Sequence, residues 1–165
     1  MAKSDSFFVR ASLDWNGTTF AQTSIDLGAY VDALGKSVLR IHNVAVMWND
    51  PTDIIAGNPA GAGYDSSAFQ ITTQSQTAMV DASDKSLITS GCLSVSQGAA
   101  PAVLTHAIDV APQHWNNGYL VGVEQIYLGC DQSFDIGATT ISVVMECTVE
   151  TLSQSAAMAL ALSQQ

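Results

Sequence analysis

The side chains that could do metal chemistry are few and widely spaced in this chain. Histidines stand at positions 42, 106 and 114, and cysteines at positions 92, 130 and 147. A zinc or iron site needs several such ligands at a recognisable spacing, such as H-x-H or H-E-x-x-H. Neither spacing occurs, and the paired-histidine motif of metal-binding cupins is absent. The sequence therefore predicts no catalytic metal and no cofactor.

Nucleophilic and acid–base chemistry has no recognisable motif either. A serine or cysteine nucleophile needs a strained turn such as G-x-S-x-G, which the chain lacks, and Cys92 falls in the middle of a predicted strand. Glu124, Glu146 and Glu150 could supply paired carboxylates for glycoside hydrolysis. However, Glu146 and Glu150 share the polar face of one predicted strand, which is typical of a solvated edge. We therefore expect that the protein is not an enzyme.

Aspartates gather in two segments where oxygen ligands could hold a calcium ion. Calcium prefers carboxylate and carbonyl oxygens, but its usual D-x-D-x-D-G loop is missing here. Ordinary turn-forming aspartates are the favoured interpretation, and a structural ion is the weaker one. The calcium candidates are Asp50, Asp53, Asp65, Asp131 and Asp135.

The net charge makes nucleic acids and anionic membranes unfavourable partners. Of the 165 residues, 15 are acidic and only five are Lys or Arg, which gives a net charge of −10. The cations are too scattered to neutralise a phosphate backbone or an anionic membrane, so direct nucleic-acid binding is not expected.

The N-terminus lacks a secretory apolar region and no apolar run approaches the length of a membrane span, so we expect synthesis in the cytoplasm. The odd, widely spaced cysteines predict buried reduced thiols.

Alternation of apolar and polar residues with a period of two predicts β-strands through most of the chain. Residues 7–15 and 21–27 alternate on either side of Asn16-Gly17, which predicts a β-hairpin. "DASDK" is predicted to join a second hairpin, between residues 68–80 and 86–98. Further strands are predicted at 37–48, within 99–113, at 118–133 and at 138–152. Gly122 and Gly129 within 118–133 predict bulges or close backbone approaches. Residues 49–67, rich in Gly, Pro, Asn and Asp, are predicted to form an exposed loop.

These elements predict an all-β fold with about eight strands. We expect an antiparallel β-sandwich, as an eight-stranded jelly roll, over residues 1–152. Residues 153–165, "SQSAAMALALSQQ", are Ala-rich and uncharged, which favours a short C-terminal helix or arm. An apolar segment of this kind needs its own domain or a neighbour to lie on.

The run "SVLRIHNVAVMWND" at 37–50 is apolar apart from a few polar residues that include Arg40 and His42. Strict alternation places Leu39, Ile41, Asn43, Ala45 and Met47 on one face, and Val38, Arg40, His42, Val44, Val46 and Trp48 on the other. The second face is polar at its start and apolar at its end, so we expect it to be partly covered. Arg40 is predicted to pair with an aspartate at an interface rather than to take part in catalysis.

The tryptophans could form a sugar-binding platform or interface anchors. Trp15 is in phase with the core face of its predicted strand. Trp115, in "PQHWNNGY", is predicted to lie in a loop and to be the most exposed of the three.

The chain resembles single jelly-roll major capsid proteins of tailless icosahedral viruses of archaea and bacteria that enclose an internal membrane. The resemblance covers the whole chain and is one of architecture: an all-β chain of this size with polar uncharged surfaces, an apolar tail at 153–165, and an N-terminus, "MAKSDS", that has no basic arm.

The resemblance implies a virion protein that assembles with copies of itself and with other virion proteins, without a membrane span but near an internal membrane. It implies that 49–67 is a tower or inter-capsomer contact and that 153–165 is an assembly arm. The predicted assembly residues are Arg40, His42, Trp48, Trp115, Met158, Leu160 and Leu162. A β-sandwich binding module, or a fibre or appendage subunit that recognises a glycan or host surface, remains the alternative, and an unrecognised enzyme is a third class.

Overall fold

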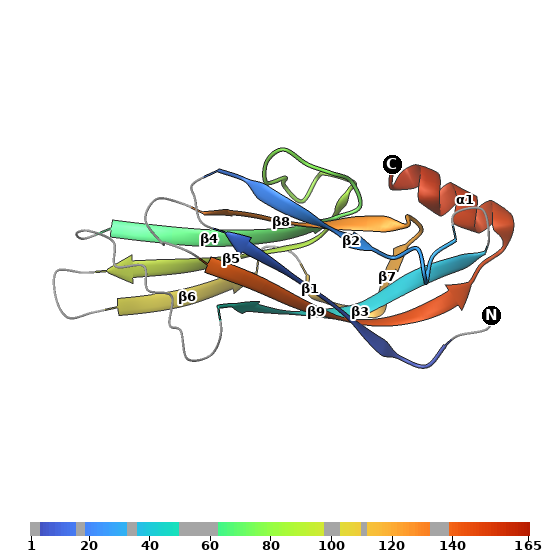
Figure 1. The fold of residues 1–165 in the computed structure, drawn as a ribbon, viewed down its shortest axis with the longest axis horizontal. Helices are drawn as coiled ribbons and strands as arrows, with labels where there is room; N and C mark the ends of the chain where they lie inside the picture. The colour runs from blue at the N-terminus through green and yellow to red at the C-terminus, as the bar shows by residue number, and fades with distance from the viewer. Residues whose placement is uncertain are drawn as a thin grey trace.

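The computed structural model describes nine strands and one helix (Figure 1). It describes residues 4–15, 19–32, 36–49, 63–97, 103–109, 112–132 and 139–165. The elements are β1 (Phe7–Trp15), β2 (Ala21–Asp26), β3 (Ser37–Trp48), β4 (Gly63–Thr72), β5 (Leu87–Gln97), β6 (Val103–Asp109), β7 (His114–Val121), β8 (Gln125–Gln132), β9 (Thr139–Thr151) and α1 (Gln154–Ser163).

The strands form two antiparallel sheets that pack face to face. The four-stranded sheet has the order β1-β9-β3-β7, and the five-stranded sheet has the order β2-β8-β4-β5-β6. The chain changes sheet at every connection except those from β4 to β5 and from β5 to β6. Without β6, this is an eight-stranded jelly roll of two four-stranded sheets, and β6 adds one strand at an edge. The predicted antiparallel sandwich with a C-terminal helix is confirmed.

The core lies between the two sheets and follows from the alternation. On β9, Ile141, Val143, Met145 and Cys147 point inward and are at most 1% exposed. Phe69, Ile71, Ile126 and Leu128 meet them from the five-stranded sheet and are fully buried. Burying side chains of this size stabilises a fold by about 1.5–3 kcal/mol each.

The predicted hairpin over residues 7–27 is wrong. β1 pairs with β9 in one sheet, and β2 pairs with β8 in the other. Both strands are amphipathic because each lays one face on the same core. Alternation is therefore the same for two strands that pair and for two that face each other across a sandwich.

The predicted single strand at 118–133 is two strands in different sheets. β7 ends at Val121 and β8 begins at Gln125. Gly122 lies at the change of sheet, where an added Cβ would sit 3.0 Å from Cγ of Leu160 in α1. Of the two predicted alternatives for Gly122, the close approach is therefore the one found, because the glycine allows the helix to approach the chain.

β4 is displaced toward the N-terminus relative to the predicted strand. It begins at Gly63, inside the predicted loop at 49–67, and ends at Thr72. Residues 73–86 then cover the outer side of Gln70, whose Nε2 donates to the carbonyl of Ala78 and whose Oε1 accepts from the N–H of Val80. Gln70 is fully buried because its amide is satisfied there. The predicted pairing of the next strand is confirmed, since β5 pairs antiparallel with β4.

The predicted C-terminal helix is confirmed as α1, which lies at one end of the sandwich (Figure 1). Ser153 caps it by accepting from the N–H of Ala156. Ala157 and Ala161 are buried against the domain. Within the described ranges, no helix is long and apolar enough to cross a membrane.

Candidate assembly surface

The outer face of β3 and β9 carries a row of polar pairs that begins with Arg40. Its Nε and Nη2 atoms each lie 2.7 Å from a different carboxylate oxygen of Glu150. The two side chains are only 18% and 9% exposed. Hydrogen bonding to Glu150 raises the pKa of Arg40 above its ordinary value, so the guanidinium is charged at any physiological pH. This geometry makes a bidentate, partly buried ion pair.

The edge strand β7 covers the Arg40 side chain. A third guanidinium nitrogen, Nη1, donates to the carbonyl of Asn117. Gly118 has a φ of +69°, and a Cβ there would lie 2.6 Å from Cγ of Arg40. Only glycine combines this backbone conformation with room for the arginine stem. At Arg40, at the polar start of this strand face, the cover is thus provided by the chain itself.

A bulge follows directly on β3. The pairing of β3 with both neighbours shifts register between Ile41 and Asn43. His42 lies at this shift, and its Nε2 is 3.0 Å from the hydroxyl of Thr148. Asn43 donates to the carboxylate of Glu146 over 2.6 Å. The polar row therefore runs along β3 and β9 as Arg40–Glu150, His42–Thr148 and Asn43–Glu146.

Because of the bulge, the predicted faces of residues 44–48 are wrong. Leu39 and Ile41 point inward as predicted, but beyond the bulge the inward residues are Val44, Val46 and Trp48. Met47, predicted on the inward face, is 44% exposed. One extra residue reverses the alternation because the period of a strand is two. The outer face is thus polar from Arg40 to Asn43 and exposes Met47 beyond.

Two further expectations about these residues are wrong. Arg40 pairs with a glutamate of its own chain rather than with an aspartate at an interface. Glu150, predicted to lie on a solvated edge, is 7% exposed. The sequence offers one signal for the pair. Cations and glutamates are rare in this chain, and Arg40 and Glu150 each lie on the polar face of a predicted strand. The roles of Arg40 and His42 in assembly stay predictions.

The predicted aromatic anchors are half-buried. Trp48 packs edge-on against Phe69 with ring centroids 5.8 Å apart. Trp115 lies on β7 rather than in a loop, and its ring centroid is 5.9 Å from that of Tyr119. Both tryptophans, like Trp15, pack against the core. The three indoles therefore do not form an exposed platform.

The outward side of α1 exposes apolar side chains. Met158 is 47% and Leu162 is 70% exposed, whereas Leu160 packs toward Gly122. Gln164, just beyond the helix, is buried and fixes it to the domain. Its side chain accepts from the N–H of Gly122 and donates to the carbonyl of Leu120, and its own carbonyl accepts from the hydroxyl of Thr73. Sequence reasoning missed Gln164, because a polar residue in a polar tail gives no signal of burial.

Metal and thiol chemistry have few candidates in this structure. Among the described residues, no three His, Cys, Asp or Glu side chains gather around a possible ion. Asp50, Asp53 and Asp135 lie outside the described residues, and Asp65 is described only as part of the β4 backbone. The Oδ1 atom of Asp131 accepts a hydrogen bond from the N–H of Gln132. Cys92, Cys130 and Cys147 are free, and the last two are buried, as predicted for reduced thiols.

Comparisons with known proteins give weak matches of fold. No family model matches the sequence, and no curated protein matches it significantly. Merkel cell polyomavirus VP1 in complex with GD1a oligosaccharide is 8% identical over 87% of this chain and 94% of that chain, with a TM-score of 0.35. The unassembled VP1 pentamer of the same virus is 7% identical with the same coverage and TM-score. Turnip yellow mosaic virus gives 9% identity over 90% and 82% of the two chains, with a TM-score of 0.29. Scores at this level carry no inference about function.

Proposed function

We propose that this protein is a self-assembling structural subunit of an icosahedral virion shell, of the kind built by tailless viruses of archaea and bacteria. The jelly-roll strand order is the observation that carries the proposal. Jelly rolls serve as viral capsid proteins, lectins and cupins, so the surface must distinguish among these classes. The described residues hold no metal cluster of the cupin kind, and the three tryptophans are half-buried rather than presented to a sugar.

Exposed apolar side chains at two separate places favour assembly over a monomeric role. Phe8 and Met47 are 55% and 44% exposed on the four-stranded sheet. Met158 and Leu162 are exposed on α1, at the end of the chain. Exposed apolar side chains at two separate places give one subunit more than one contact point for its neighbours, which a closed shell requires.

The negative net charge favours a shell protein that does not itself bind the viral genome. With 15 acidic residues against five Lys and Arg, the chain repels a phosphate backbone. Its partners would be copies of itself and other virion proteins, near an internal membrane. It would be made in the host cytoplasm and act in the virion, without enzymatic activity.

Residues 153–165 are proposed as an assembly element that is already folded on its own domain. α1 is fixed by Gln164 and presents Met158 and Leu162 outward, so it offers a rigid apolar ridge rather than a loose arm.

Substitutions on α1 test this proposal. Met158→Ser with Leu162→Ser should leave the thermal midpoint nearly unchanged but weaken association, as measured by light scattering after size exclusion. Ala159→Ser, on an exposed position of the same helix, is the matched control and should assemble normally. Normal assembly of the double variant would contradict the role of α1.

One observation favours the alternative of a glycan-binding module. A hollow of about 620 Å³ lies between residues 73–75 and the start of β8, and the polar side chains in its lining include Gln74, Ser75, Gln125 and Tyr127. Amide and hydroxyl groups of this kind bind sugar hydroxyls. A monomer that binds a glycan array, and loses binding on Gln125→Ala, would support this alternative over the shell.

A further inference from the structure

The outer edge of β1 is open to another strand. Within the described part of the chain, β1 pairs with β9 on one side and with no strand on the other. It is nine residues long and has neither a proline nor a bulge, two of the devices that protect edge strands. Alternate backbone N–H and C=O groups of such a strand point outward and can pair with a second strand.

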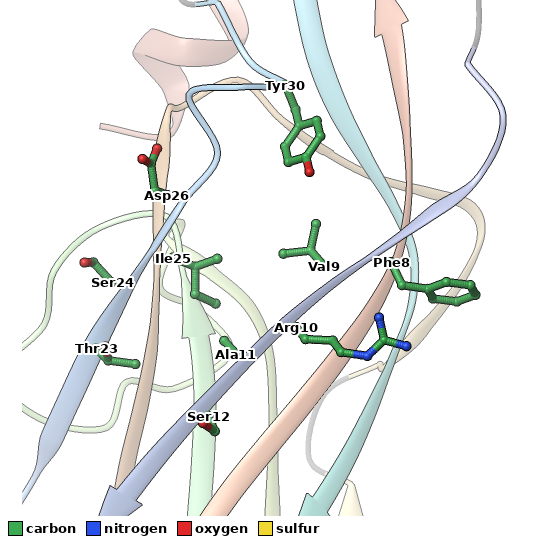
Figure 2. Close-up of a pocket in the computed structure, with 10 residues that line it drawn as sticks. All are labelled: Phe8, Val9, Arg10, Ala11, Ser12, Thr23, Ser24, Ile25, Asp26 and Tyr30. Atoms are coloured by element: carbon green, nitrogen blue, oxygen red, sulfur yellow. The ribbon is translucent and has the colours of Figure 1, made fainter.

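The space beside this edge is hollow. A groove of about 480 Å³ runs between β1 and β2, the edge strands of the two sheets, and Tyr30 lies at one end. Figure 2 shows Val9, Ala11 and Ile25 pointing into the space between the two strands. Residues 8–12 of β1 therefore line an open space along the free edge of the strand.

The inward side chains of β1 are incompletely covered. Val9, Ala11 and Leu13 are partly buried, whereas Ile141 and Val143 on the adjacent β9 are at most 1% exposed. The difference arises because β1 has a neighbouring strand on one side and β9 has one on both sides. Another strand beside β1 would bury the remaining apolar surface.

The outward-pointing charged side chains of β1 determine which partner strand can pair with it. Arg10, Ser12 and Asp14 point outward. The guanidinium of Arg10 lies 5.6 Å from the ring of Phe8 and makes no ion pair with a described residue. If a second β1 pairs antiparallel about a two-fold axis at Ser12, each Arg10 stands opposite an Asp14 of the other copy. On the inward face, each Ala11 then stands opposite a Leu13.

Other registers are less favourable. An axis at Arg10 or at Asp14 places like charges opposite each other, which is destabilising. An axis at Ala11 or at Leu13 leaves both charges without an opposite charge on the second copy. A register shifted by one residue pairs inward with outward side chains. The axis at Ser12 therefore satisfies both faces.

We propose that two copies of this chain pair through β1, antiparallel about a two-fold axis at Ser12, so that their four-stranded sheets become one eight-stranded sheet. The inference rests on the proposed self-assembly and names one of its contacts. Pairing of two copies can be measured separately from shell formation.

Cross-linking tests the register. In a Cys92→Ser background, Ser12→Cys places two thiols opposite each other at the axis, where cross-strand Cβ atoms lie about 5 Å apart. Mild oxidation should give a disulfide-linked dimer. Ser142→Cys is the matched control, because Ser142 pairs with Ser12 on the neighbouring strand. Its two copies would lie three strand spacings apart, about 14 Å, and should not cross-link.

Charge reversal tests the partner. Arg10→Asp alone and Asp14→Arg alone each place like charges opposite each other twice, so dimerisation should weaken by on the order of tenfold or more. The double variant Arg10→Asp/Asp14→Arg should restore it. An equimolar mixture of the two single variants should form heterodimers, because their charges are complementary.

The outcomes separate this inference from the proposed function. Cross-linking through Ser12→Cys together with charge-swap rescue supports the two-fold contact. Shells or rings that form without either result overturn the contact and leave the proposed function standing. A monomer at all concentrations overturns both, and pairing of β1 with an added foreign peptide but not with itself also overturns the proposal.

Discussion

Arg40 and Glu150, 110 residues apart in sequence, form a bidentate ion pair across β3 and β9. They lie diagonally, because Arg40 is opposite Thr148 in the β3–β9 register. The pair satisfies the charge of Arg40 within one subunit. Contact between a second subunit and this part of β3 therefore does not require desolvation of an unpaired Arg40 cation.

Removing Arg40 is expected to destabilise the fold. Arg40→Met leaves the carboxylate of Glu150 buried without its cation, and breaking such a pair costs about 3 kcal/mol. Urea unfolding followed by circular dichroism would measure the loss. Arg40→Met with Glu150→Leu is the control and should lose less than Arg40→Met alone, since no unpaired charge remains. An equal or larger loss in the double variant would show that packing, not charge, dominates at this position.

Gly118→Ala is expected to destabilise the protein by about 1–3 kcal/mol, because a φ of +69° is strained for alanine and its Cβ would meet Arg40. Gly28→Ala is the matched control, since that glycine has no positive φ and the nearest atom to its Cβ would be Oδ1 of Asp26 at 3.1 Å. Thermal unfolding should separate the two variants by several degrees. Equal midpoints would contradict the described path of β7.

The bulge on β3 predicts opposite outcomes at neighbouring positions. Val46→Asp buries a charge against the core and should prevent stable folding, whereas Met47→Asp should change stability by no more than about 0.5 kcal/mol. Strict alternation from Leu39 would predict the reverse. Urea midpoints of the two variants decide between the two registers.

The cysteines should differ in reactivity. Burial raises the pKa of Cys130 and of Cys147 to about 12 each, so both thiols stay protonated at pH 8. Cys92 is only partly buried. Titration with a thiol-specific reagent should modify Cys92 first in the native protein and all three after denaturation. Rapid native modification of Cys147 would contradict its place in the core.

The same thiols should make stability fall in alkali. Their pKa is higher in the folded than in the unfolded state, so their contribution is complete below the ordinary thiol pKa near 9 and is lost as the pH rises toward about 12. The variant Cys130→Ala/Cys147→Ala should show a shallower decline over this window. Parallel declines would mean that other groups cause the loss.

Much of the architecture could be predicted from the sequence, because amphipathic strands must lay one face on a core. The strand predicted at 138–152 is present as β9, and its alternate residues Ile141, Val143, Met145 and Cys147 are buried. Sheet membership could not be predicted in the same way. β1 and β2 alternate as a hairpin would, yet they lie in different sheets, since alternation reports burial and not the identity of the neighbouring strand.

The candidate surface was predicted less well, because it depends on contacts distant in sequence. The bulge at His42 reverses the faces of Met47 and Trp48 without any local signal such as glycine. The burial of Gln164 arises from backbone groups of Leu120 and Gly122, which no periodicity in the tail reveals.

Sedimentation velocity of the purified full chain, in the salt of its source and over a range of concentrations, tests the central claim most directly. The account predicts dimers at low concentration that give way to rings or closed shells, visible as regular particles by electron cryo-microscopy. A single species at the 17.3 kDa of one chain throughout would contradict it.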